Sequence, residues 1–266
     1  MIKRVRNWLR EKRYKQHKLQ SVGARRSLRL VTLGSDYGGW TFHEDESLQG
    51  CTIVSAGLGE DASFDVEFAN RFNARVVIID PTPRAVAHFG AMKKRFGQGG
   101  ETGYVSGGSQ PVEAYDLSTC SEDNLIMVDR ALWCRNETLR FFLPENPEHV
   151  SHSIVNFQND YRQDTDHLIV QAGTLREILD DHAIPVEEVQ LLKLDIEGAE
   201  VEVLEQMLAD GLRPRQICVE YDELNRPGKK AFQRVDAADK ALRAAGYVCV
   251  YGNGSTDYLY LHEKQA

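Results

Sequence analysis

From Leu30 onward, short apolar runs alternate with longer stretches in which apolar residues recur three or four positions apart. Short aliphatic runs such as RVVII at 75–79 are typical of buried strands, and the longer spacing predicts amphipathic helices. Strands are expected at 51–56, 75–79, 125–133, 139–143, 168–171, 190–195 and 217–220, and helices at 61–72, 85–95, 174–182, 198–210 and 230–245. This alternation predicts an α/β fold with a doubly wound, mostly parallel sheet, closed by an antiparallel edge hairpin at 247–251 and 258–261.

Charge is divided unevenly along the 266 residues. Residues 1–29 contain eleven Lys and Arg residues and one acid, Glu11, whereas the remainder contains 21 basic and 39 acidic residues. Sparse apolar residues at helical spacing predict a basic amphipathic helix in this first segment, separate from an α/β domain at 30–266. Two interpretations stay open: the segment binds an anionic membrane surface, nucleic acid or an acidic partner, or it lies solvated against its own acidic body.

The rest of the composition favours a cytoplasmic globular protein. Five scattered cysteines without a C-x-x-C pair argue against a zinc site or a disulfide framework and favour a reducing compartment. No apolar run approaches the about 20 residues that span a bilayer, and the charged N-terminus lacks an apolar signal region. We therefore expect a cytoplasmic protein, peripheral at the inner membrane surface if residues 1–29 bind it.

A glycine-rich segment at 55–62 (SAGLGEDA) follows the first clear strand and opens a helix. Glycines allow the backbone to approach a ligand there, and the N–H groups of the helix start point at it. Asp80 ends the next strand, where an acid commonly binds ribose hydroxyls. NAD-dependent oxidoreductases and S-adenosylmethionine-dependent methyltransferases both place a nucleoside in this way.

Charge in this loop separates the two enzyme classes. Glu60 and Asp61 would repel a pyrophosphate, whereas S-adenosylmethionine has no phosphate and carries positive charge at its sulfonium and amine. The acids therefore favour the methyl donor. An oxidoreductase remains the enzymatic alternative because Gly57-x-Gly59-x-x-Ala62 fits a dinucleotide loop, and a non-catalytic binding module is the third possibility.

Residues 193–200 (KLDIEGAE) end a strand with charged side chains and lead into a helix. They resemble the K-[IL]-D-[VI]-E-G-A-E signature of the FkbM family of S-adenosylmethionine-dependent methyltransferases. Residues 34–40 (GSDYGGW) resemble a loop that precedes the sheet and lies near the cofactor in related methyltransferases, and 217–221 resemble the strand after the signature. The resemblance covers roughly 31–222 and implies a class I methyltransferase fold, which is Rossmann-like, with S-adenosylmethionine as cofactor.

The first loop departs from the family pattern D-x-G-x-x-x-G, because Ser55 and Asp61 stand at its two ends. Ser55 can hydrogen-bond the amino acid part of the donor but cannot neutralise its ammonium, a role that we assign to Asp36 or Glu60. The loop pattern and the resemblance together predict the following donor-binding residues: Asp36, Gly38, Ser55, Ala56, Gly57, Gly59, Glu60, Asp80, Pro81 and Asp195.

Methyl transfer is an in-line displacement, so the protein must align a nucleophile and, for a hydroxyl, remove its proton. Asp195 is expected to orient the acceptor or accept its proton, and Lys193, two residues earlier on the same strand face, to influence Asp195. His152 has the intrinsic pKa of a general base. Glu197 is expected to cap the following helix. No His/Asp spacing supports a metal, and none is expected.

The acceptor is indicated by the resemblance alone, which implies a hydroxyl of a sugar, a glycan or a polyketide-type natural product. Methyltransferases that act on the amino groups of DNA bases use an N/D-P-P-aromatic loop, which residues 80–83 (DPTP) do not match, so nucleic acid is not expected. If residues 1–29 bind a membrane, a lipid-linked glycan becomes a plausible acceptor.

Overall fold

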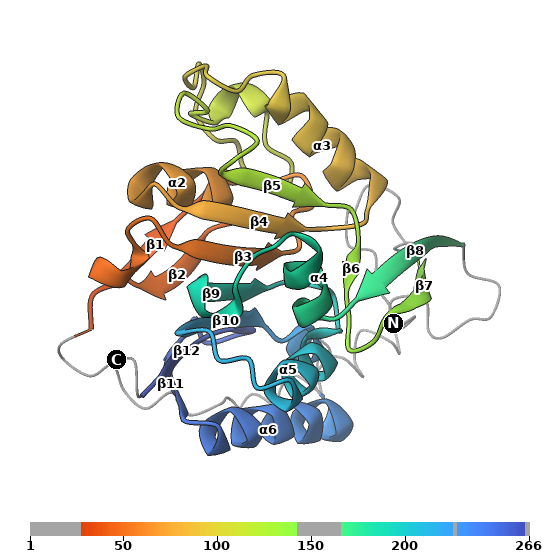
Figure 1. Ribbon diagram of the computed structural model, residues 1–266. Coiled ribbons are helices and arrows are strands. Elements are labelled where there is room, and N and C mark those ends of the chain that lie inside the picture. The colour runs from red at the N-terminus through yellow and green to blue at the C-terminus, as the bar shows by residue number, and fades with distance from the viewer. Residues whose placement is uncertain (1–27, 143–165, 226–227, 264–266) are drawn as a thin grey trace, which may run out of the picture.

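A seven-stranded sheet forms the centre of the computed structural model, which describes residues 28–142, 166–225 and 228–263 (Figure 1). In spatial order its strands are β11 (Tyr247–Gly252), β12 (Asp257–His262), β10 (Gln216–Glu220), β9 (Val189–Leu194), β3 (Thr52–Ala56), β4 (Arg75–Ile79) and β5 (Leu125–Val128). Neighbours from β10 to β5 pair in parallel, and β12 pairs antiparallel with both β10 and β11. The predicted mostly parallel sheet with an antiparallel edge hairpin is confirmed.

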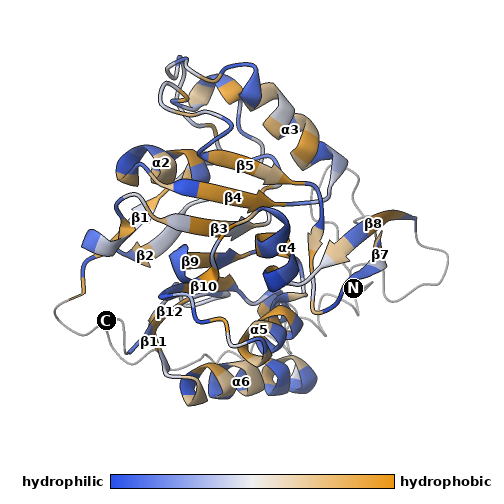
Figure 2. Cartoon of the chain, viewed as in Figure 1, coloured by the Kyte–Doolittle hydropathy of each residue, from blue (hydrophilic) through white to orange (hydrophobic). Residues whose placement is uncertain are grey.

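Helices cover both faces of this sheet. One face carries α4 (Leu175–Asp181), α5 (Glu200–Ala209) and α6 (Lys229–Ala244). The other carries α2 (Ser63–Phe72), α3 (Pro83–Lys93) and β2 (Trp40–His43). Short 3-10 turns lie at η1 (Glu46–Leu48), η2 (Val112–Ala114), η3 (Val186–Glu188) and η4 (Asp222–Asn225). Because both faces are covered, the central strands are apolar along most of their length, as Figure 2 shows for β3, β4 and β5.

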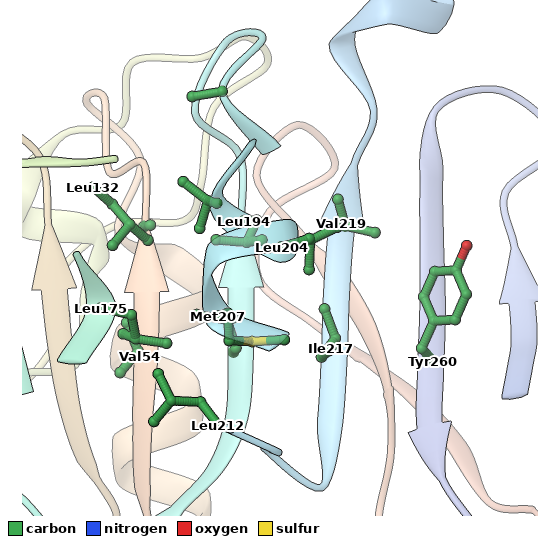
Figure 3. Packing of buried hydrophobic residues seen from close by; sticks show 14 of the residues in the cluster. Val54, Leu132, Leu175, Leu194, Leu204, Met207, Leu212, Ile217, Val219 and Tyr260 are labelled. Atoms are coloured by element: carbon green, nitrogen blue, oxygen red, sulfur yellow. The ribbon is translucent and has the colours of Figure 1, made fainter. Parts of the chain in front are cut away.

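The core between α5 and the sheet illustrates the packing. Leu204 and Met207 of α5 lie over Leu194 of β9 and Ile217 of β10, and all four side chains are buried (Figure 3). Full burial of one such side chain stabilises the fold by about 1.5–3 kcal/mol. This layer fixes β9 and β10 side by side, so that their carboxyl ends reach the same edge of the sheet.

The structure differs from the sequence-based expectation at 125–143. The expected strand at 125–133 is interrupted at Asp129-Arg130, so that β5 joins the central sheet while β6 (Ala131–Leu132) joins a separate sheet in the order β6-β8-β7. There β7 (Glu137–Phe142) pairs with β8 (His167–Gly173), not with the run before it. The sequence predicts two strands here but not their partners, and periodicity cannot identify a partner that is distant in sequence. This small sheet lies beyond the arrowheads of β3, β4 and β5 (Figure 1).

A second feature that the sequence did not predict is the hairpin of β1 (Leu30–Leu33) and β2. Gln216 of β10, which is fully buried, accepts a hydrogen bond from the N–H of His43 (2.9 Å) and donates to the carbonyl oxygen of His43 (2.7 Å). This side chain therefore fastens the hairpin to the central sheet. The loop at 34–39, between β1 and β2, is positioned by the same attachment.

Two expectations concern residues outside the described part of the chain. The expected helix at 1–29 falls almost entirely on residues 1–27, and the candidate base His152 lies within 143–165. Among the helices that the structure describes, none is long and apolar enough to cross a membrane.

Candidate cofactor and acceptor site

A cavity of about 640 Å³ opens at the carboxyl ends of the central strands. Gly57 after β3, Asp80 after β4, Asp195 after β9 and Glu220 at the end of β10 all line it, and Phe141 from β7 contributes to a further side. The cavity lies where the strand order reverses between β3 and β9. Open α/β sheets bind their ligands at this topological position.

The turn after β3 requires glycine at position 57. Gly57 has a φ of 89°, and a Cβ atom there would lie 1.8 Å from the backbone oxygen of Asp195. Lys193 Nζ donates a hydrogen bond to the Gly57 carbonyl oxygen at 2.5 Å and lies 5.3 Å from the centre of the Trp40 ring. The ends of β3 and β9 are thus held against each other in the cavity wall.

Asp80 holds the glycine-rich loop in place. Its Oδ2 accepts hydrogen bonds from the N–H groups of Leu58 and Gly59, both at 3.0 Å, and its Oδ1 accepts from the N–H (2.8 Å) and hydroxyl (2.7 Å) of Thr82. Asp80 is 6% exposed and lines the cavity at the edge where ribose binding was predicted. Two loop N–H groups that could bind a pyrophosphate already have an anionic partner, which argues against a dinucleotide.

Asp61 fastens the loop at 34–39 to the start of α2. Its Oδ2 accepts a hydrogen bond from the Ser35 hydroxyl (2.6 Å), and its Oδ1 accepts from the N–H of Ser63 (3.0 Å). The Ser35 oxygen in turn accepts from the N–H groups of Tyr37 and Gly38. A Cβ at Gly38 would lie 2.7 Å from the Asp61 carboxylate, so glycine permits this close approach. The acid that departs from the family pattern therefore has a structural role.

The two acids predicted to neutralise the donor's ammonium lie in different surroundings. Asp36 is exposed and lies outside the cavity lining, whereas Glu60 lines the cavity and forms an ion pair with Arg84. Gly59 and Pro81 line the cavity as predicted. The remaining predicted residues, Ser55 and Ala56, are fully buried within β3 and lie behind the lining.

Four carboxylates gather at the ends of β9, β10 and β12, namely those of Asp195, Glu220, Asp222 and Asp257. Burial and the negative charges of Asp195 and Asp257 raise the pKa of Glu220 to about 8. Burial also raises the pKa of Asp195, while the Lys193 ammonium opposes this shift. The cluster therefore contains two carboxyl groups that hold their protons more tightly than ordinary carboxyl groups do. Within the described ranges, no group of three or more His, Cys, Asp or Glu residues is arranged to hold a metal ion.

The signature segment forms the turn between β9 and α5. Glu197 has a left-handed φ of 56° and Gly198 one of 100°, and Glu197 lines the cavity. The fully buried Glu200 accepts hydrogen bonds from the N–H groups of Ile196 (2.9 Å) and Gly198 (3.1 Å). Glu200 therefore satisfies the backbone before α5, a role that the sequence analysis did not assign to it.

Three residues that line the cavity are not among the site residues predicted from the sequence. Tyr37 is 64% exposed, with its ring against the backbone of Gly108 at the cavity, and Phe141 reaches the cavity from the small sheet. Asp257 pairs with Glu220 in the register of β10 and β12. Tyr37 belongs to the loop at 34–40 that the resemblance places near the cofactor, whereas the pairing of β7 and β12 with distant strands brings Phe141 and Asp257 to the site and no local pattern in the sequence indicates this.

The charge of the lining fits S-adenosylmethionine. Its eight acids are Glu60, Asp61, Asp80, Asp195, Glu197, Glu220, Asp222 and Asp257. The basic residue among the described lining residues is Lys193, whose ammonium already donates to Gly57. A cavity of this charge attracts a cationic sulfonium and ammonium and repels phosphates. Gly57 and Gly59 are the residues that would hold the nucleoside part of the donor, and Asp80 fixes their loop with a carboxylate that already accepts four hydrogen bonds.

The strand order, the reversed strand β12 and the acidic cavity at the switch point define a class I methyltransferase with S-adenosylmethionine as its cofactor. Residues 74–249 match the model of the methyltransferase FkbM domain. Because this match spans more than half of the chain, the protein belongs to the FkbM family of S-adenosylmethionine-dependent methyltransferases. No curated protein matches the chain at a significant level.

Solved structures of methyltransferases and related proteins also align with the chain. The antibiotic-resistance methyltransferase Kmr is 14% identical with a TM-score of 0.35, over 87% of this chain and 100% of that chain. The Methanococcus jannaschii fibrillarin pre-rRNA processing protein is 8% identical with a TM-score of 0.37, over 92% and 87%. TYW2 of M. jannaschii in complex with AdoMet is 9% identical with a TM-score of 0.34, over 88% of each chain. These alignments say nothing about the acceptor of this protein.

Proposed function

We propose that the protein transfers a methyl group from S-adenosylmethionine to a hydroxyl oxygen of a sugar, a glycan or a natural product. When bound, S-adenosylmethionine supplies an electrophilic methyl group on its sulfonium. The observation that carries the proposal is the pair of carboxyl groups of Asp195 and Glu220 on the cavity lining, both with raised pKa values. A raised pKa makes the ionised form of a carboxyl group a stronger base toward a hydroxyl proton than an ordinary carboxylate is.

Asp195 is the residue that we assign to the acceptor. It directly follows β9, is partly exposed to the cavity and lies against the Gly57 turn. In this role it orients the acceptor hydroxyl and takes its proton, with Glu220 available to share that proton. Lys193 positions the site, since its ammonium holds the Gly57 carbonyl and lowers the pKa of Asp195.

The other walls of the cavity support an uncharged, hydroxylated acceptor. The rings of Tyr37 and Phe141 offer apolar faces against which the C–H face of a sugar ring can pack. The carboxylates opposite are acceptors for sugar hydroxyls. A phosphate-rich acceptor such as nucleic acid is disfavoured by the same negative charge.

The test is an acceptor screen with matched variants. Purified protein, S-adenosylmethionine and separate pools of glycans, phenolic natural products, amines and RNA are assayed for S-adenosylhomocysteine, and the methylated atom is located by mass spectrometry. We expect transfer to a hydroxyl oxygen, slowed by about 10²-fold or more in Asp195→Asn when the rate is compared at saturating S-adenosylmethionine.

The matched control is Glu205→Gln, an exposed acid on α5, which should keep the wild-type rate. Methylation of nitrogen or of RNA would overturn the proposal. So would a rate that is unchanged in Asp195→Asn, because that residue would then have no part in the reaction.

A further inference from the structure

A buried pair of opposite charges lies on the α2 side of the sheet, beneath the Gly57 turn. Asp65 of α2 is 1% exposed and Lys193 of β9 is 4% exposed. Lys193 pairs in register with Ser55 of β3, so the two side chains leave the sheet at adjacent positions on one face. The residues two positions earlier on these strands, Ile53 and Leu191, pack in the same core cluster as the apolar side of α2. This arrangement places Asp65 over Ser55 and Lys193.

The hydrogen bonding of this buried group is incomplete. Ser55 Oγ and Asp65 Oδ1 have no hydrogen-bond partner among the described residues, although the Ser55 hydroxyl lies close enough to lower the pKa of Asp65. An incompletely bonded carboxylate in the core costs free energy. The Asp65 charge therefore stabilises the fold little. Its favourable electrostatic interaction is with the Lys193 ammonium.

The raised pKa of Asp65 still lies below pH 8, the pH of the test described below. Burial raises its pKa to about 6, the Lys193 ammonium from β9 and the Ser55 hydroxyl from β3 lower it, and Asp61 at the start of α2 raises it. Above this pKa the ionised Asp65 carboxylate lies in the core, on the side of Lys193 away from the cavity. Lys193 Nζ meanwhile donates to the Gly57 carbonyl in the cavity wall.

We propose that Asp65 is a positioning residue for the methyl donor: its carboxylate balances the Lys193 ammonium, which keeps that ammonium on the Gly57 carbonyl and prevents it from repelling a cation in the cavity. The proposal rests on the donor site on which the proposed function also depends. Opposite charges that share a buried region influence each other without direct contact, because water does not screen them there. An uncompensated ammonium in the lining would therefore weaken binding of a positively charged ligand more than that of a neutral one.

The test uses this difference in ligand charge. S-adenosylmethionine carries one net positive charge at pH 8, whereas S-adenosylhomocysteine lacks the sulfonium and has none. Both are titrated calorimetrically into the full-length wild-type protein and Asp65→Asn, a nearly isosteric change. We expect the affinity for S-adenosylmethionine to fall about tenfold or more, and that for S-adenosylhomocysteine by less than about threefold. The matched control, Glu122→Gln, removes one exposed carboxylate and should leave both affinities unchanged.

A purely structural role for Asp65 gives a different result. Because Asp65→Asn leaves the buried Lys193 ammonium without its counter-charge, a lower Tm at pH 8 is expected whichever role Asp65 has. The two roles differ in whether the losses of affinity for the two ligands are equal. A lower Tm with equal losses for both ligands, or an unchanged affinity for S-adenosylmethionine, would overturn the proposal. Failure of the wild-type protein to bind either ligand is separate, because it would overturn the donor site itself.

A second variant keeps the test decisive if Asp65→Asn does not fold. Asp65→Asn combined with Lys193→Met removes both charges, and replacing buried opposite charges by neutral groups is commonly tolerated. If Asp65 acts through Lys193, the double variant should restore the wild-type ratio of the two affinities to within about threefold. The mechanism is contradicted if the ratio of S-adenosylmethionine affinity to S-adenosylhomocysteine affinity is as low in the double variant as in Asp65→Asn. If Asp65→Asn cannot be measured, a ratio in the double variant below the wild-type ratio contradicts it.

Discussion

Replacing Asp80 by Asn changes one carboxylate oxygen to an amide and tests whether this residue holds the cofactor loop. In the native structure Asp80 accepts four hydrogen bonds, two from the N–H groups of Leu58 and Gly59 and two from Thr82. An amide has one oxygen only. Whichever way it turns, its NH₂ group faces two donors that lose their acceptor.

The size of the effect follows from these contacts. A buried donor left without a partner costs about 1–3 kcal/mol, so two such groups, with some relaxation, give a loss of about 3 kcal/mol. For a domain of this size that loss lowers Tm by about 6–12 °C. The loop that carries Gly57 and Gly59 is no longer fixed at the cavity, so the affinity for S-adenosylmethionine should also fall by about tenfold.

The assay is thermal unfolding at pH 8 followed by calorimetric titration, with Asp116→Asn as the control. Asp116 Oδ1 accepts from the N–H (3.1 Å) and hydroxyl (2.6 Å) of Ser118, which is the same local turn that Asp80 forms with Thr82, but on an exposed loop. We expect this variant to lose less than about 0.5 kcal/mol. If both variants lose the same stability and the same affinity, Asp80 does not hold the loop and the reasoning is refuted.

Three further predictions concern the cavity and the N-terminal segment. Gly57→Ala should lower the free energy of unfolding, measured by chemical denaturation, by more than about 3 kcal/mol because the new Cβ meets Asp195. Gly50 also has a positive φ but has open space around it, so Gly50→Ala should lower it by about 1–2 kcal/mol. Equal losses would contradict the close approach. Because the pKa of Glu220 is raised to about 8, binding of the cationic donor at pH 7 should release protons, and the affinity should increase as the pH rises through 8. Calorimetry in buffers of different ionisation enthalpy measures the proton release. Binding without proton release would count against this role of the carboxylate cluster. We also propose that residues 1–29 form a separate basic segment that binds anionic membranes. Their deletion should abolish sedimentation of the protein with anionic vesicles and leave donor affinity unchanged. Retained sedimentation would reject this role.

The sequence predicted the central sheet because its strands are covered on both faces. Runs such as 75–79 are apolar throughout, and the helices between them show a clear period, so β4 and α2 were found within a few residues of their bounds. The small sheet could not be found in this way. β6 is only two residues long, and β7 finds its partner β8 across 143–165, a pairing that depends on long-range contacts and leaves no local pattern.

For the site, the sequence identified residues that lie at strand ends and missed those brought in by packing. Gly57, Asp80 and Asp195 follow directly from strand-to-helix turns. Asp65 and Asp257 do not, because one is a helix residue and the other belongs to an edge hairpin, and only the register of the sheet shows what they face. The role of the acid missing at Ser55 is assigned from the sequence to Asp36 or Glu60; of these two, Glu60 lines the cavity and Asp36 does not.

The central claim is that the acidic cavity binds a cationic methyl donor and not a dinucleotide. The most direct test is parallel calorimetric titration of the wild-type protein with S-adenosylmethionine, S-adenosylhomocysteine and NAD at one pH and ionic strength. The charge of the lining and the engaged loop N–H groups predict micromolar binding of the first two and none of NAD. Binding of NAD alone would contradict the account, and no binding of any of the three would leave the fold as a scaffold without this cofactor.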